Sequence, residues 1–441
     1  MSTNYLQLYD QASEAEKYPL VKQWIDEEPL AFFKQLREER PILDTPEFTV
    51  LSRFDDVTEV LGMPKVFTVD LYKPKMADYL MAHDDDALHY REKSLMQSLL
   101  NRDDLPHIRQ LVADIANEIL DQADGKLELA YGYSRAVPAV MVQRYFGLRG
   151  SKREDLIRWS YWNQYDAFHN QPFNLNSAEK TQHITDEHDK VSAELGAYIA
   201  KLMVRRALFV NIEKVTNVIL APLLMVGRLL RHLTGRTKKG LQDDMVTRML
   251  RMKFPKEYDF NIVRLGINAG GLLIGSIETT SQAVSQIVAY MYEHPDVLQQ
   301  AQRAARAADP AAFDAIVWET LRYVPIGPFL FRKAASDYTV GRGTERETTI
   351  PKGKVVLAAT LSAMFDPLIF ERPDEFLPTR NWYHYFHFGF GSHECLGKYI
   401  GMVMIPEMVR QLLRREEVRP SAEIDYQDGP FPENYPFIWR K

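Results

Sequence analysis

One cysteine occurs in the 441 residues of the chain, Cys395, and its neighbours are unusual. It lies in the stretch HFGFGSHECLGK, residues 387–398. Three histidines, His384, His387 and His393, lie within twelve residues of the chain together with it. Three imidazoles and one thiolate are a ligand set that zinc accepts, so a zinc site is one interpretation.

The glycines of the same stretch favour a different interpretation. Gly389, Gly391 and Gly397 leave room for a flat, bulky group to approach the backbone closely. We expect Cys395 to lie at the start of the last helix, about 395–415, where N–H groups can stabilise a thiolate. A thiolate in this setting is suited to be an axial ligand of haem iron.

The ten residues FGFGSHECLG, from Phe388 to Gly397, resemble the haem-binding loop of the cytochrome P450 superfamily. That loop has the pattern Phe-x-x-Gly-x-His/Arg-x-Cys-x-Gly, which Phe388, Gly391, His393, Cys395 and Gly397 fill. The resemblance, to a soluble protein of bacterial type, implies haem b with Cys395 as the iron ligand. It places Phe388, Gly389 and Gly397 beside the cofactor.

A second motif, GSIETT, Gly275 to Thr280, falls inside a long predicted helix, 256–293. Asp259 and Asn261 are its candidate N-caps. An uncompensated buried carboxylate is costly, so Glu278 in this apolar helix indicates a functional role. The resemblance implies that Glu278 and Thr279 are the acid–alcohol pair that handles protons during O2 activation. It also implies that Gly275 lies next to the haem.

A third motif, ETLR, places Glu319 and Arg322 on one helix face, where they can pair. The segment RPDEFLPTR, residues 372–380, resembles the irregular segment that precedes the family's cysteine loop. The resemblance implies a buried cluster of Glu319, Arg322 and Arg380 with a structural role.

Haem carries two carboxylates, and buried carboxylates need cationic partners. By resemblance we expect these partners to be His107, Arg109, Arg332 and His393. The family often has His-x-x-x-Arg in this helix, and Leu111 occupies the fifth position here.

Apolar and aromatic residues dominate the segments expected around the substrate, so a hydrophobic small molecule is favoured. These segments include 67–81 and 160–173. The predicted contacts are Phe67, Leu71, Phe168, Leu272, Ile326 and Phe329.

The surrounding pattern predicts a mainly α protein with minor β structure. Helices are expected at 27–40, 55–62, across much of 105–205 and at 311–323, and short strands at 47–54, 337–341, 347–351 and 354–360. No linker-like segment divides the chain, so we expect one large domain, 1–441. The resemblance implies the triangular P450 fold, with the long central helix over the haem.

Composition excludes several classes of partner. The net charge of −6 gives no basic face for nucleic acid, and one cysteine cannot provide an iron–sulfur cluster. We therefore expect electrons from NAD(P)H to arrive through a separate reductase and a ferredoxin-type or flavodoxin-type partner. The longest run without charged residues, 279–292, is too short for a membrane span, and the polar N-terminus predicts a cytoplasmic protein.

Residues 208–240 form an insertion relative to the family pattern. From 211 to 240 they carry six basic residues and one acid, Glu213, around the apolar run VILAPLLMVG. Such a segment can lie on a membrane surface or dock on a partner. A surface helix with a basic rim explains the same pattern.

Three functional hypotheses follow. The first is a haem-thiolate monooxygenase that inserts one oxygen atom of O2 into a hydrophobic substrate. The second is a peroxide-using hydroxylase or an isomerase of the same fold, against which the Glu278–Thr279 pair argues. The third is a non-enzymatic protein that binds haem, or zinc.

Overall fold

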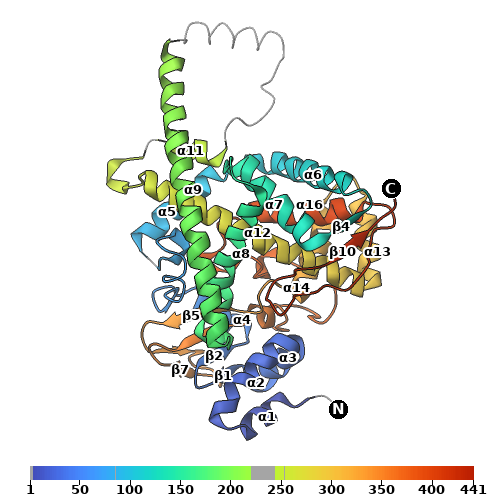
Figure 1. Ribbon diagram of the computed structural model, residues 1–441. Helices are drawn as coiled ribbons and strands as arrows, with labels where there is room; N and C mark the ends of the chain where they lie inside the picture. The colour runs from blue at the N-terminus through green and yellow to red at the C-terminus, as the bar shows by residue number, and fades with distance from the viewer. Residues whose placement is uncertain (1–2, 85, 220–243, 253) are drawn as a thin grey trace.

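Helices make up most of the computed structural model, which describes residues 3–84, 86–219, 244–252 and 254–441 (Figure 1). They are α1 (Tyr5–Gln11), α2 (Glu14–Glu27), α3 (Pro29–Glu39), α4 (Phe54–Leu61), α5 (Ala87–Leu99), α6 (Leu105–Gln122), α7 (Ala136–Met141), α8 (Arg153–His169), α9 (Ala178–Ile219), α11 (Met245–Arg251), α12 (Ile262–Glu293), α13 (Pro295–Ala305), α14 (Ala311–Tyr323), α15 (Thr360–Ala363) and α16 (Lys398–Leu413). The predicted α-rich class is confirmed.

The long central helix is α12. The Asn261 side chain caps it by accepting hydrogen bonds from the N–H groups of Val263 and Arg264, and the helix ends before Pro295. It therefore begins six residues later than predicted. Its apolar residues are buried along most of its length, because α8, α9, α14 and α16 pack around it. Figure 1 shows it crossing the middle of the helical part.

In the described part of the chain, short strands form three small sheets. The strands are β1 (Ile42–Asp44), β2 (Phe48–Leu51), β3 (Phe67–Thr68), β4 (Lys126–Glu128), β5 (Leu330–Ala334), β6 (Tyr338–Val340), β7 (Thr348–Ile350), β8 (Val355–Ala358), β9 (Arg419–Pro420) and β10 (Pro436–Ile438). The largest sheet has the order β1-β2-β8-β5-β3, and only its β2–β8 pair is parallel. The others are β4-β10-β9 and β6-β7. All four predicted strand regions are confirmed.

Two large hydrophobic cores hold most of these elements together in the described residues, beside a small cluster of Tyr165, Ile184 and Phe431. One lies among the helices around α12 and α16, and the other joins α1–α4 to the largest sheet. Tyr323, at the end of α14, and Tyr385 pack against both cores. The segment between α14 and α16 therefore connects the two parts of the molecule.

Helix α9 runs past α8 and α12 and continues beyond the helices around it, as Figure 1 shows. The first part of the predicted insertion, 208–219, is the end of this helix. Residues 220–243 lie outside the described residues, and so does the rest of that prediction. None of the helices in the described ranges is long and apolar enough to cross a membrane.

Candidate active site

The Cys395 loop is shaped by two glycines with positive φ. Gly389 has φ +76° and Gly391 has φ +72°, a region that side chains rarely adopt. A Cβ on Gly391 would also lie 2.8 Å from the Leu61 carbonyl oxygen. The turn brings the Cys395 N–H within 2.8 Å of the Phe388 carbonyl oxygen. The loop thus presents the cysteine on a constrained backbone.

The thiol is accessible, yet it lies deep in the protein. Its side chain is exposed, while burial is the main cause that raises the pKa of Cys395. A side chain can be both exposed and far from the outer surface when its sulfur faces open space inside the molecule. The Gly397 N–H and the charges of Lys93 and Lys398 act in the opposite direction and lower this pKa. The predicted N–H donor is therefore present, although α16 begins three residues after Cys395, at Lys398.

The middle of α12 borders open space too. Gly275 is exposed, and a Cβ there would meet no atom within 4 Å. One turn later, the Thr279 hydroxyl donates to the Gly275 carbonyl oxygen at 2.7 Å. Tyr79 connects this helix to the thiol. Its ring lies where a Cβ on Gly271 would be, and the Cys395 thiolate adds to the burial that raises the pKa of Tyr79.

Glu278 is fully buried and paired. Arg135, at the end of the π-helical turn Ala130–Arg135, donates to its two carboxylate oxygens at 2.8 and 3.1 Å. Burial raises the pKa of Glu278, and the Arg135 guanidinium lowers it. The predicted acid is therefore compensated by an arginine that the sequence motif did not reveal.

Four basic side chains lie close together at the cysteine loop. His393 belongs to the loop, and the others are His89, Lys93 and Arg332. Lys93 donates to the carbonyl oxygens of Ser392 and Glu394, and the rings of His89 and His393 lie 4.4 Å apart. Arg332 is buried, and its guanidinium donates to the Phe331 carbonyl oxygen at 2.8 Å.

No carboxylate forms an ion pair with this basic cluster among the described residues. Burial lowers the pKa of Lys93 to about 8 and that of His393 to about 2. Nε2 of His393 is buried and has no hydrogen-bond partner in the described part of the chain. The buried charges of Lys93 and Arg332 are stabilised by an anion, and two carboxylates on a flat group fit that need. The residues therefore fit haem.

Two predicted cofactor contacts are wrong. His107 is exposed on α6, away from this cluster. Arg109 donates to Asp314, on α14, at 2.5 Å and to Glu407, on α16, at 3.1 Å. These two carboxylates compensate the charge of Arg109. The two ion pairs join α6 to α14 and α16.

The helix that supplies these contacts is α5. His89 and Lys93 have the spacing i, i+4, which places both on one helix face. This His-x-x-x-Lys pattern was available in the sequence. The motif alone does not single it out, because the family pattern has arginine at the second position and His107 lies near the start of the following helix.

The predicted structural cluster forms. Arg322 donates to both oxygens of Glu319 at 2.7 and 3.1 Å, and Arg380 donates to the same carboxylate at 3.2 Å. The Tyr385 hydroxyl and the Leu377 N–H add bonds of 2.6 and 2.9 Å. Glu319 and Arg322 are both fully buried. One carboxylate therefore organises the segment before the cysteine loop.

The predicted substrate contacts divide into two groups. Phe67 is fully buried and its ring packs on Tyr338, so it is a core residue and the prediction was wrong. Leu272 is also buried in the helical core. Leu71, Phe168, Ile326 and Phe329 are only partly buried, and their contact with substrate stays a prediction.

The zinc interpretation lacks a geometric basis. No group of three or more His, Cys, Asp or Glu side chains is placed to hold a metal ion within the described ranges. His387 instead bonds through Nε2 to the Trp318 carbonyl oxygen at 2.9 Å, and burial lowers its pKa to about 3. His384 packs on Phe54 and Phe370.

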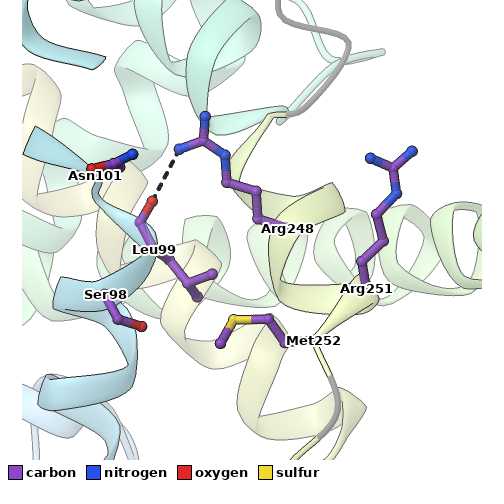
Figure 2. Close-up of a pocket in the computed structure, with 6 residues that line it drawn as sticks. All are labelled: Ser98, Leu99, Asn101, Arg248, Arg251 and Met252. Atoms are coloured by element: carbon purple, nitrogen blue, oxygen red, sulfur yellow. Dashed lines mark hydrogen bonds between the residues drawn. The ribbon is translucent and has the colours of Figure 1, made fainter. Parts of the chain in front are cut away.

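A groove of about 410 Å³ lies apart from this chemistry, between the end of α5 and α11. Figure 2 shows its lining, in which Arg248 donates to the Leu99 carbonyl oxygen at 3.1 Å. Arg248 also pairs with Asp104. None of the predicted site residues lines it, so we do not assign the reaction to this groove.

Comparison with known proteins agrees with this geometry. A family model described as "Cytochrome P450" matches residues 46–429. The chain is 24% identical to the cyclomarin C epoxidase CymV of Salinispora arenicola, over 90% of this chain and 92% of the relative. It is also 24% identical to the mycinamicin IV hydroxylase/epoxidase of Micromonospora griseorubida, over 89% and 90%.

Solved structures agree on the fold. CalO2 superimposes with a TM-score of 0.71 at 19% identity, covering 94% of this chain and 97% of CalO2. CYP109E1 from Bacillus megaterium, in complex with testosterone, gives 0.71 at 18%, covering 94% and 99%. The chain belongs to the cytochrome P450 family, the haem-thiolate monooxygenases.

Proposed function

We propose that the protein binds haem b through Cys395 and hydroxylates or epoxidises a hydrophobic organic molecule. In the hydroxylation, substrate, O2, two electrons and two protons give hydroxylated substrate and water. The observation that carries the proposal is the accessible thiol beside a buried basic cluster that has no acidic partner among the described residues. The haem supplies the O2 activation, and the chain supplies the binding and the protons.

Each chain residue has a separate task in this proposal. Arg332, Lys93 and His393 bind the two haem carboxylates, and the Gly397 N–H moderates the charge on the sulfur. Thr279 supplies a proton from its hydroxyl on the accessible side of α12. In the structure this hydroxyl donates to the Gly275 carbonyl oxygen. Glu278 supplies protons to the Thr279 hydroxyl.

The spectrum of the reduced protein with carbon monoxide tests the proposal. We expect a strongly red-shifted Soret band, which indicates a thiolate ligand, and we expect Cys395→Ala to abolish it. Glu394→Ala is the matched control, because it changes the adjacent residue and should keep the band. Purified protein that takes up no haem, or that keeps the band in Cys395→Ala, would overturn the proposal.

The electrons come from NAD(P)H through a reductase and a ferredoxin-type or flavodoxin-type partner. Lys398 lies at the cysteine loop and pairs with Glu394 at 2.6 Å, and we propose this face for docking. Exchange of Lys398 for Glu should slow reduction by an acidic partner while leaving reduction by dithionite unchanged.

The substrate is hydrophobic in this proposal. Two relatives are named as enzymes that oxidise cyclomarin C and mycinamicin IV. The partly buried aromatic residues Phe168 and Phe329 support an apolar substrate here. A spin-state titration with apolar natural products of graded size identifies the preferred class.

We also propose that the end of α9 contacts an anionic membrane surface. Val204, Leu208, Phe209 and Ile212 are 58–62% exposed on neighbouring turns. The sequence that follows has basic residues and no acid from 214 to 242.

Vesicle co-sedimentation tests this second proposal. Leu208→Ser with Phe209→Ser should weaken binding to phosphatidylglycerol vesicles by about tenfold or more, because each apolar side chain contributes roughly 1.5–3 kcal/mol when buried. Leu368→Ser, at another exposed leucine, is the control. Equal binding of both variants would contradict the proposal.

A further inference from the structure

The guanidinium of Arg135 is shared between two carboxylates. It donates to Glu278 at 2.8 and 3.1 Å and to Glu433 at 2.9 and 3.1 Å. Arg135 and Glu278 are almost completely buried, whereas the Glu433 side chain is 22% exposed. One positive charge thus faces two groups that can each be negative, and one of them communicates with solvent.

The paired position of Glu278 is not the one from which it can deliver a proton. Its carboxylate is buried against Arg135, whereas Thr279, the next residue, lies on the accessible side of α12. A proton reaches the Thr279 hydroxyl from Glu278 only if the carboxyl group leaves Arg135. If Glu278 were the only carboxylate bound to Arg135, its departure would leave a buried, unpaired arginine. The free-energy cost of that state would keep Glu278 in place.

Glu433 removes this obstacle, because Arg135 keeps a bidentate carboxylate when Glu278 leaves. The negative charge of Glu433 and burial both favour the protonated, neutral form of Glu278, and Arg135 favours the charged form. The neutral form is the one that can leave the guanidinium while carrying a proton. The groups with an electrostatic effect on this exchange are Arg135, Glu433 and Tyr161.

We propose that Glu433 is a positioning residue that releases Glu278 from Arg135, so that Glu278 can carry a proton to the Thr279 side of α12. One proton leaves Glu278 in each excursion. The resulting carboxylate returns to Arg135 and is reloaded from solvent on the side of Glu433. The inference rests on the proposed monooxygenase function, because that reaction consumes the protons.

The C-terminal loop keeps Glu433 in register. The Glu433 N–H donates to the Asp425 carbonyl oxygen at 2.9 Å, within a bridge that joins Asp425 and Asn434. The ring of Tyr161, on α8, lies 5.2 Å from the Arg135 guanidinium. Burial and the nearby Glu433 carboxylate raise the pKa of Tyr161. A loop far from α12 in the sequence thereby controls a group on that helix.

Infrared spectroscopy of the haem-free protein tests, without any turnover, whether Glu433 influences the protonation of Glu278. The C=O band of protonated Glu278 is assigned by its loss in Glu278→Gln. In Glu433→Gln we expect the titration midpoint of this band to fall by about one pH unit or more, because a competing negative charge is removed. An unchanged midpoint would overturn the inference.

Turnover of the haem-loaded protein gives the second readout. Glu433→Gln should lower product formation by about tenfold and increase the solvent isotope effect, because release of Glu278 limits proton delivery. Asp425→Asn is the matched control. The Asp425 side chain supports the same loop by accepting from the Gln427 N–H at 2.9 Å, and within the described residues it forms no hydrogen bond or ion pair with Arg135.

The outcomes separate the two proposals. If the control and Glu433→Gln lose activity equally, Glu433 only anchors the loop, and the inference is wrong. If the infrared midpoint shifts but no variant shows a thiolate-type carbon monoxide spectrum, the proposed cofactor is wrong while the coupling of the two carboxylates stands.

Discussion

Lys93 extends its ammonium into the interior of the protein, where it donates to two backbone carbonyl oxygens of the cysteine loop. Burial lowers its pKa to about 8, so its charge is poorly compensated without an added anion. Arg332 is in the same situation, because burial lowers its pKa as well. The free energy that haem binding gains at these residues therefore comes from compensating charges that are already buried.

A pair of substitutions tests this explanation. Lys93→Met keeps the length of the side chain and removes the charge, so haem affinity should fall by roughly 1.5–3 kcal/mol, the range for a charged hydrogen bond. His107→Ala, at the residue predicted from sequence, should leave affinity unchanged. Haem transfer to apomyoglobin measures both, and the opposite ranking would contradict the assignment.

The sequence predicted the site residues that lie inside fixed motifs. Cys395, Glu278 and the Glu319 cluster are specified by spacing over a few residues, which local helix and loop geometry preserves. Arg135 and Glu433 were missed, because they lie 143 and 155 residues from Glu278 in the sequence and belong to no motif. The prediction of His107 was wrong for a related reason, since histidines open several helices and only packing shows that His89 lies at the cysteine loop.

The segment between β3 and α5, residues 69–84, is joined to α8 by a buried ion pair and by the packing of Tyr72 on Phe168. It is also joined to α12, where Arg264 donates to the Asp78 carbonyl oxygen at 2.8 Å. Lys75 pairs with Asp166 at 2.8 Å, and the Asp166 side chain is only 2% exposed. The Gln171 amide adds a bond of 3.3 Å to the Leu71 carbonyl oxygen. Tyr79, which lies against Gly271, belongs to the same segment.

Loss of this contact should loosen the segment. We expect Lys75→Met to speed amide hydrogen exchange of residues 69–84 by about tenfold or more, because Asp166 loses its charged hydrogen bond. Lys73→Met is the control, since Lys73 pairs with Asp70 and Asp84 and is 48% exposed. Equal effects of both variants would show that Lys75 has no special role.

Elements with local boundary signals were predicted accurately. Helix α14 occupies 311–323 as expected, because Pro325 follows it closely. The range predicted for α12 started six residues too early, because a short 3₁₀ turn, Lys256–Tyr258, follows Pro255 before the helix begins. The true cap, Asn261, is one of the two candidates. Strand β1 was not predicted, because three residues give too little periodicity to recognise.

At the scale of the whole molecule, the two hydrophobic cores meet around Glu319. Tyr323 and Tyr385 contact both cores, and Glu319 bonds to Tyr385, Arg322 and Arg380. A carboxylate with these partners sits where the helical part and the sheet part are joined. Loss of this carboxylate should therefore destabilise both the helical part and the sheet part.

The stability of the whole chain tests this role. Glu319→Gln leaves a buried arginine partly unpaired, so the free energy of unfolding should fall by about 3–5 kcal/mol. Glu371→Gln, at a side chain that is 89% exposed, should change it by less than about 0.5 kcal/mol. Chemical denaturation followed by circular dichroism measures both, and similar values for the two would contradict the structural role of Glu319.

The single cysteine has a practical consequence. Cys395 is the only thiol in the sequence, its side chain is accessible, and in the proposed cofactor complex it is bound to iron. A thiol-specific reagent can then modify each molecule at most once, and only when the cofactor is missing. The stoichiometry of labelling, read as a single mass increment, counts the cofactor-free fraction of any preparation.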